Sequence, residues 1–185
     1  KVIRGFLGIQ IQDFDAEMQQ AVNRVQSEAE TRAVIDAARA NGFVSVNADL
    51  IYGLPQMTLS EWDEQLTIAL DHGMPHLSAY CLTVEAKTVL AHQVKKGTVS
   101  MPADDAQSAQ FDRLMERMDR AGLDHYEISN FGKPGHWSRH NTSYWEGVPY
   151  VGVGPSAHSF NGTERRWNVA NNARYVKPHS EGRRF

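Results

Sequence analysis

This chain has a single cysteine, a small net charge and no long apolar run, and each of these features excludes or disfavours a class of structure or partner. Cys81 is the only cysteine among 185 residues, so no disulfide can form within the chain, which is typical of proteins of the reducing cytoplasm. The net charge of −3 gives no electrostatic basis for nucleic acid as a partner. No apolar run approaches the ~20 residues of a membrane-spanning helix, so the sequence predicts no transmembrane segment.

The composition is nevertheless that of a folded protein. Hydrophobic residues make up 41% of the chain and charged residues 22%, which is enough apolar material for a core. The length suits one domain, or one domain and part of another. The chain starts at Lys1 without an initiator methionine and ends at Phe185 without a helix cap or a polar tail. We therefore expect a segment of a longer protein.

Strand patterns alternate with amphipathic helix patterns along the first two thirds of the sequence. Alternating or β-rich apolar runs predict strands at 7–11, 44–51, 76–82 and 125–129. Helical spacing and caps predict helices at 15–23, 27–40, 90–96, from Thr58 to Gly73, and from Asp104 to Gly122. Three successive strand–helix units with short turns predict parallel strands in an α/β fold, either as part of a barrel or as an open doubly wound sheet.

The amino-acid composition of the sequence changes near residue 130. Glycine, proline, aromatic residues and histidine become frequent, and helical periodicity is lost. We therefore expect residues 1–129 to form the α/β part and residues 130–185 to belong to an accessory region.

Polar side chains lie at the predicted strand ends. Asp49 comes late in a buried strand that breaks at Gly53 and Pro55, and Gln12 follows the first strand. The carboxyl ends of parallel strands share one edge of the sheet, where ligands bind, and a carboxylate there can accept hydrogen bonds from ribose hydroxyls. Arg24 could fold over this edge as an anion partner. The alternatives are a turn-capping aspartate, a strand-end amide and a helix-end cation.

Three histidines lie in the region after residue 130. His136, His140 and His158 are candidate metal or haem ligands, because neutral imidazole binds iron and zinc. A zinc site is disfavoured, since the chain has no HExxH motif and no second cysteine. The commoner role of a loop histidine is a hydrogen bond to the backbone, and that alternative stays open.

Several motifs together resemble a known family. They are Gly8-Ile9-Gln10-Ile11-Gln12-Asp13-Phe14, Asn23-Arg24, Asp49-Leu50-Ile51-Tyr52-Gly53-Leu54-Pro55, His76-Leu77-Ser78-Ala79-Tyr80, Tyr126-Glu127-Ile128-Ser129-Asn130-Phe131, Arg139-His140-Asn141-Thr142-Ser143-Tyr144-Trp145 and Gly152-Val153-Gly154-Pro155-Ser156-Ala157-His158-Ser159. In this order they resemble the radical S-adenosylmethionine proteins of the oxygen-independent coproporphyrinogen III oxidase family. The motifs around Tyr126 and His140 are similar to its HemW branch, which is described as haem chaperones.

The resemblance implies a fold and a set of cofactors. It implies a partial TIM-like barrel of parallel strands that binds S-adenosylmethionine at its carboxyl-terminal rim. Residues matching Gln12, Arg24 and Asp49 contact that cofactor in the family, and the residue matching Ile51 lies near its adenine. The family also holds a [4Fe–4S] cluster on three cysteines of a CxxxCxxC motif. With Cys81 alone, this chain cannot hold the cluster, so we expect its ligands in a preceding segment and expect the chain alone to be inactive.

The resemblance leads to a functional prediction with two rivals. The favoured reading is haem binding and haem delivery, with haem or porphyrin as ligand and a haem-accepting respiratory protein as partner. His140 is the preferred haem ligand, because it stands in the His-Asn-x-x-Tyr-Trp motif, and Arg139 could pair with a propionate. The first alternative is an oxygen-independent coproporphyrinogen III oxidase. The second is a nucleotide-binding α/β module without redox chemistry.

Overall fold

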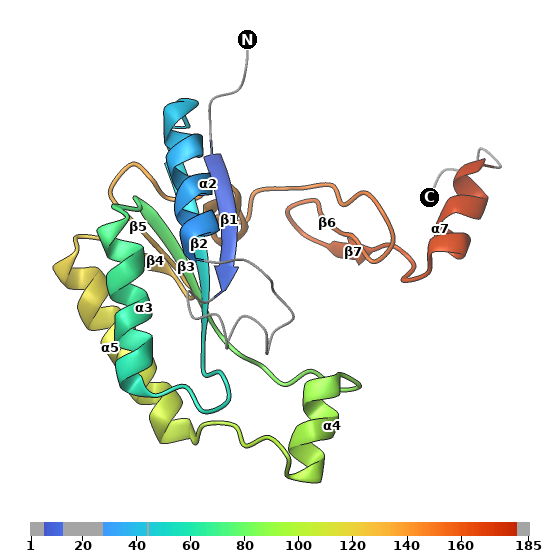
Figure 1. The fold of residues 1–185 in the computed structure, drawn as a ribbon. Helices are drawn as coiled ribbons and strands as arrows, with labels where there is room; N and C mark the ends of the chain where they lie inside the picture. Colours follow the sequence, from blue (N-terminus) through green and yellow to red (C-terminus); the bar gives the residue numbers. More distant parts are fainter. Residues whose placement is uncertain (1–5, 13–27, 44, 181–185) are drawn as a thin grey trace. The chain divides into compact units, whose positions relative to one another are not determined.

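The computed structural model describes residues 6–12, 28–43 and 45–180 (Figure 1). The chain divides into two compact units, residues 1–137 and residues 138–185. The sequence predicted a boundary near residue 130, whereas the structure divides into its two units after residue 137. Each unit is described by itself.

The first unit contains a mixed five-stranded sheet in the order β1-β2-β3-β5-β4. Its strands are β1 (Phe6–Gln12), β2 (Ser45–Tyr52), β3 (His76–Cys81), β4 (Asp124–Glu127) and β5 (Asn130–Gly132). The first three strands are parallel to one another, as the strand–helix alternation predicted. The predicted helix at 15–23 lies outside the described residues.

The last two strands differ from the sequence-based expectation. The sequence indicated one strand at 125–129 in a parallel series. Instead, β4 and β5 pair with each other and β5 pairs with β3, both antiparallel. Only Ile128 and Ser129 separate β4 from β5, and so short a connection joins antiparallel strands, because a parallel crossover needs about a dozen residues or more. The expectation of parallel strands throughout was therefore wrong at this edge.

Helices α2 (Glu28–Ala40), α3 (Leu59–Asp71) and α5 (Asp104–Arg120) pack against the sheet (Figure 1). Helix α3 begins as the sequence predicted, since Thr58 and Glu61 form a complete capping box. Helix α4 (Val89–Lys96) ends at Gly97, whose left-handed backbone (φ 72°) favours glycine. The core between helices and sheet is formed by Ile35, Ala38, Val46, Ala48, Leu50, Trp62, Leu66, Ala69, Leu77, Ala79, Leu114, Met118 and Phe131.

The second unit has less regular structure. It contains α6 (Arg139–Trp145), a hairpin of β6 (His158–Phe160) and β7 (Arg165–Trp167), and α7 (Asn172–Ser180). Tyr150 adds an antiparallel bridge to Phe160. Gly152 lies so close to this hairpin that an added Cβ would sit 2.1 Å from the carbonyl oxygen of His158. Close backbone packing therefore explains Gly152, whereas Gly154 has a φ of 111°, a backbone conformation that favours glycine.

None of the helices in the described part of the chain is both long enough and apolar enough to cross a membrane.

Candidate functional site

The parallel register places three of the predicted site residues on adjacent strands: Gln12 on β1, and Asp49 and Ile51 on β2. Asp49 lies beside Gln10 on β1 and Ser78 on β3. Gln12 ends β1 and pairs with Leu50 after an irregularity in the register. Ile51 lies two residues after Asp49, so the two side chains are on the same face of β2. The side chain of Gln12 and the whole of Arg24 lie outside what the structure describes.

The two faces of β2 have opposite chemical character. Ala48 and Leu50 are fully buried in the core beneath the helices. Asn47, Asp49 and Ile51 alternate with them and face the other way. Asn47 is almost completely buried, whereas Asp49 and Ile51 are half-buried. A half-buried carboxylate at the carboxyl end of a parallel strand can both reach a ligand and bind it in partly desolvated surroundings.

A chain of buried hydrogen bonds connects Asp49 to the neighbouring strands. The Asn47 side-chain amide lies 2.5 Å from Asp49 Oδ1 and 3.0 Å from the Ser78 hydroxyl. The other end of the same side chain, Asn47 Oδ1, lies 2.5 Å from His76 Nδ1. His76 Nε2 lies 2.6 Å from the Tyr126 hydroxyl on β4. We call Asn47, Asp49, His76, Ser78 and Tyr126 the inner-face network.

The protonation state of His76 gives this network a direction. His76 is completely buried, and burial lowers its pKa from 6.5 to about 4, while nearby Glu127 acts in the opposite direction. At neutral pH the ring is therefore uncharged. Since Asn47 Nδ2 faces a carboxylate, Asn47 Oδ1 faces the ring and must accept from Nδ1–H. Nε2 then accepts from the hydroxyl of Tyr126.

A second branch ends at another carboxylate. The hydroxyl of Ser78 donates to Asn130 Oδ1 at 2.7 Å, and the amide nitrogen of Asn130 donates to Glu127. Glu127 also accepts from the backbone N–H of Ser129 at 3.2 Å. One branch thus ends on an oxygen of Asp49 and the other on an oxygen of Glu127. In each branch, the hydrogen bonds are donated in the direction of the carboxylate. The sequence analysis did not find this network, because its members are far apart in the sequence.

The loop after β2 is held by a side chain from α5. Gln110 Oε1 accepts from the backbone N–H of Gly53 at 2.9 Å, and Gln110 Nε2 donates to the carbonyl of Met57 at 3.0 Å. Gly53 has a φ of 73°, in the region that favours glycine. Gln110 is 1% exposed, so it acts as a buried clamp on the turn that follows Asp49 and Ile51. No local pattern in the sequence pointed to this role.

The three candidate histidines lie in different surroundings. His136 is half-buried in the first unit, and the neighbouring Trp137 stacks on Tyr126 with ring centres 5.3 Å apart. His140 is exposed in the first turn of α6, edge-on to Tyr144 at 5.0 Å. His158 is exposed on β6, 6.1 Å from the ring of Trp167. Among the described residues, no group of three or more His, Cys, Asp or Glu side chains could hold a metal ion.

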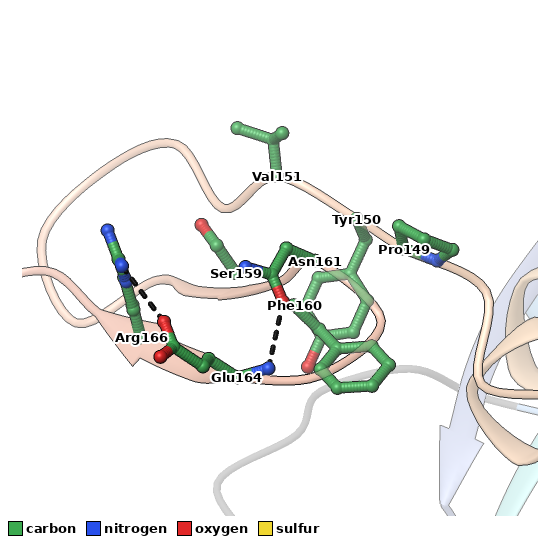
Figure 2. A pocket seen from close by; sticks show the side chains of 8 residues that line it. All are labelled: Pro149, Tyr150, Val151, Ser159, Phe160, Asn161, Glu164 and Arg166. Atoms are coloured by element: carbon green, nitrogen blue, oxygen red, sulfur yellow. Dashed lines mark hydrogen bonds and ion pairs between the residues drawn. The ribbon is translucent and has the colours of Figure 1, made fainter.

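The second unit has an open hollow of about 470 Å³ between residues 149–151 and the β6–β7 hairpin (Figure 2). Its lining residues are Pro149, Tyr150, Val151, Ser159, Phe160, Asn161, Glu164 and Arg166. Glu164 and Arg166 form an ion pair of 2.9 Å across one side, which Figure 2 marks with a dashed line. None of the candidate haem ligands lines this hollow.

Comparisons with known proteins agree with the motifs. No family model matches the chain. The haem chaperone HemW of Mycobacterium tuberculosis is 38% identical over 156 residues, which cover 84% of this chain and 40% of that protein. HemW of Bacillus subtilis is 33% identical over 170 residues, covering 92% of this chain and 45% of the relative.

A solved structure gives the same answer for the fold. Coproporphyrinogen III oxidase (HemN) from Escherichia coli, described as a radical SAM enzyme, matches with a TM-score of 0.75 and 25% identity. The match covers 95% of this chain and 43% of that one. The chain is therefore similar to HemW in sequence, as its motifs indicated, and to HemN in fold, and it spans less than half the length of each of these proteins.

Proposed function

We propose that this chain is part of a haem chaperone of the HemW type and that it supplies part of an S-adenosylmethionine site. The observation that carries the proposal is the half-buried carboxylate of Asp49, at the carboxyl end of a parallel strand, with one oxygen held by Asn47. Carboxylate oxygens are suitable acceptors for the two hydroxyls of a ribose. Ile51, on the same face, is apolar and half-buried, which suits contact with adenine.

Two further residues complete the proposed site. Gln12 ends the strand beside β2, and Arg24 follows within a dozen residues along the chain. We assign Arg24 to the carboxylate of the methionine part, because a guanidinium binds a carboxylate through two parallel hydrogen bonds. The arrangement of the three parallel strands supports a barrel rim as the setting of this site.

The [4Fe–4S] cluster belongs to the proposed whole protein but not to this chain. A cluster needs several thiolates, and Cys81 is the only one here. The residues of the chain therefore fit S-adenosylmethionine and do not fit the cluster. When bound, the two groups together would supply the radical chemistry of the superfamily; the residues of this chain bind and orient the nucleoside part.

Haem is the proposed cargo, a haem-accepting respiratory protein is the proposed partner, and the cytoplasm is the proposed location of the protein. The support is the similarity to proteins named as haem chaperones. His140, His136 and His158 remain the candidate axial ligands, in that order of preference, with Arg139 as a propionate partner. All four lie in or beside the region after residue 130.

A second function has support from the fold comparison. The structural similarity to HemN favours a coproporphyrinogen III oxidase as the alternative. Fold similarity alone does not set the reaction, so the two must be separated by assay. Tight haem binding without coproporphyrinogen turnover by the full-length protein would support the chaperone, and turnover would support the oxidase.

The S-adenosylmethionine site is tested by calorimetry on the full-length protein with its cluster reconstituted without oxygen. Asp49→Ala should weaken binding roughly 10- to 100-fold, since a hydrogen bond to a charged group contributes about 1.5–3 kcal/mol. Arg24→Ala should weaken it comparably. Asp71→Ala, which removes an exposed carboxylate at the end of α3, is the control and should leave binding unchanged. Unchanged affinity in both Asp49 and Arg24 variants would refute the site.

A further inference from the structure

The inner-face network suggests a role for a residue that no motif identified. We propose that Asn47 is a positioning residue: its amide holds one oxygen of Asp49 and so aims the other at the ribose of S-adenosylmethionine. The inference rests on the proposed function, because it concerns the orientation of a carboxylate assigned to that site. It adds a specific physical cause for the binding geometry of Asp49.

The first support is the contact itself. Asn47 Nδ2 lies 2.5 Å from Asp49 Oδ1, and Asn47 is 6% exposed. The two residues are neighbours on the same face of β2. Asp49 Oδ2 makes no hydrogen bond with the described residues, so it is available to a ligand. The terminal torsion of an aspartate is soft, and a carboxylate without such a contact would rotate freely.

The second support is that Asn47 cannot turn over. An amide could in principle present either its oxygen or its nitrogen to Asp49. Here the oxygen faces His76 Nδ1 at 2.5 Å, and the second N–H of the amide faces the Ser78 hydroxyl at 3.0 Å. A flipped amide would place its oxygen against the Asp49 carboxylate. That contact would be repulsive in buried surroundings, which fixes the observed orientation.

The third support is that His76 is itself held. Its Nδ1 lies against Asn47 and its Nε2 lies 2.6 Å from the Tyr126 hydroxyl, so both ring nitrogens have partners. Gly132 lies close to the ring, since an added Cβ there would lie 3.1 Å from His76 Cδ2 and 3.1 Å from Trp137. Asn47 is thus bonded to a buried ring that is held at both nitrogens, and Asp49 is held by Asn47.

The test is a double-mutant cycle on S-adenosylmethionine affinity in the reconstituted full-length protein. Asn47→Ala should weaken binding about 5- to 10-fold, less than the loss of Asp49 itself, because the carboxylate stays and loses only the contact that orients it. In the Asp49→Ala background, Asn47→Ala should change affinity less than about twofold, because the carboxylate that it orients is gone. Asn41→Ala, which removes an exposed amide just after α2, is the control and should leave affinity unchanged.

The outcomes separate the inference from the proposed function. If Asp49→Ala binds like wild type, the proposed site fails and the inference fails with it. If Asp49→Ala is weakened but Asn47→Ala is not, or if the two losses multiply in the double variant, only the inference is overturned. If Asn47→Ala does not fold, Asn47→Ser replaces it in the cycle. Serine keeps a polar group at this buried position, but its side chain is one atom too short to hold Asp49 as the amide does.

Discussion

Acidification should destabilise this fold through a single buried histidine. His76 is completely buried, and both of its ring nitrogens are used within the inner-face network. Burial lowers the pKa of His76 from 6.5 to about 4. Between these two values the unfolded chain binds a proton that the folded chain does not. Stability therefore falls as the pH drops from about 6.5 to about 4.

The size of the effect follows from the pKa difference. A shift from 6.5 to about 4 corresponds to about 3 kcal/mol at 1.36 kcal/mol for each pH unit. Screening by the surrounding polar groups and solvent reduces the expected value to roughly 2 kcal/mol. This is a large share of the 5–15 kcal/mol by which domains of this size are typically stable.

The measurement is urea denaturation at pH 7.5, 6.5, 5.5 and 4.5, followed by the fluorescence of the tryptophans, one of which is buried Trp62. His76→Asn removes the titrating ring while keeping an amide donor, so its stability should be lower at neutral pH but nearly flat through the same range. The exposed His92→Asn is the control and should retain the decline of the wild type. A His76→Asn variant that declines as steeply as the wild type would refute the reasoning.

Three further predictions concern the Gln110 clamp, the iron–sulfur cluster and haem. Gln110→Ala should destabilise the fold by about 3 kcal/mol, because the Gly53 N–H and the Met57 carbonyl lose their buried partner. Gln107→Ala is the control, and equal stability of the two variants in urea denaturation would contradict the clamp. The chain as given should bind no [4Fe–4S] cluster on anaerobic reconstitution, since it has one cysteine; iron and sulfide near four per chain would contradict this. In the full-length protein, loss of a haem ligand should weaken the Soret response on haem titration, and wild-type binding by single and triple alanine variants would exclude all three candidates: His140, His136 and His158.

The parts of the fold that could be predicted are those set by short-range patterns. The capping box of α3 depends on Thr58 and Glu61, three residues apart, and the structure confirms it. The parallel pairing of β1, β2 and β3 followed from alternating strand and helix periods. The position of Asp49 in the second half of a strand could be predicted because the turn at Gly53 directly follows that strand, while its role in ligand binding stays a prediction.

The parts that were missed depend on contacts between distant residues. The sequence treated His76 only as the start of a strand, and nothing local shows that it lies opposite Asn47 in the register of β2 and β3. The role of Gln110 depends on a helix that packs against a turn 57 residues earlier. Helix α6 and the β6–β7 hairpin were also missed, because short elements in a glycine-rich region carry weak periodicity.

The two effects assigned to His76 are separable for a chemical reason. A proton added to the ring goes to Nε2, which then becomes a donor facing the Tyr126 hydroxyl. That hydroxyl must turn to accept, and the charge is buried, so the fold is destabilised. The bond from Nδ1–H to Asn47 Oδ1 needs no change, and neither does the bond from Asn47 to Asp49. Protonation of His76 should therefore reduce stability before it disturbs the orientation of Asp49, whereas removal of the Asn47 amide should disturb that orientation directly.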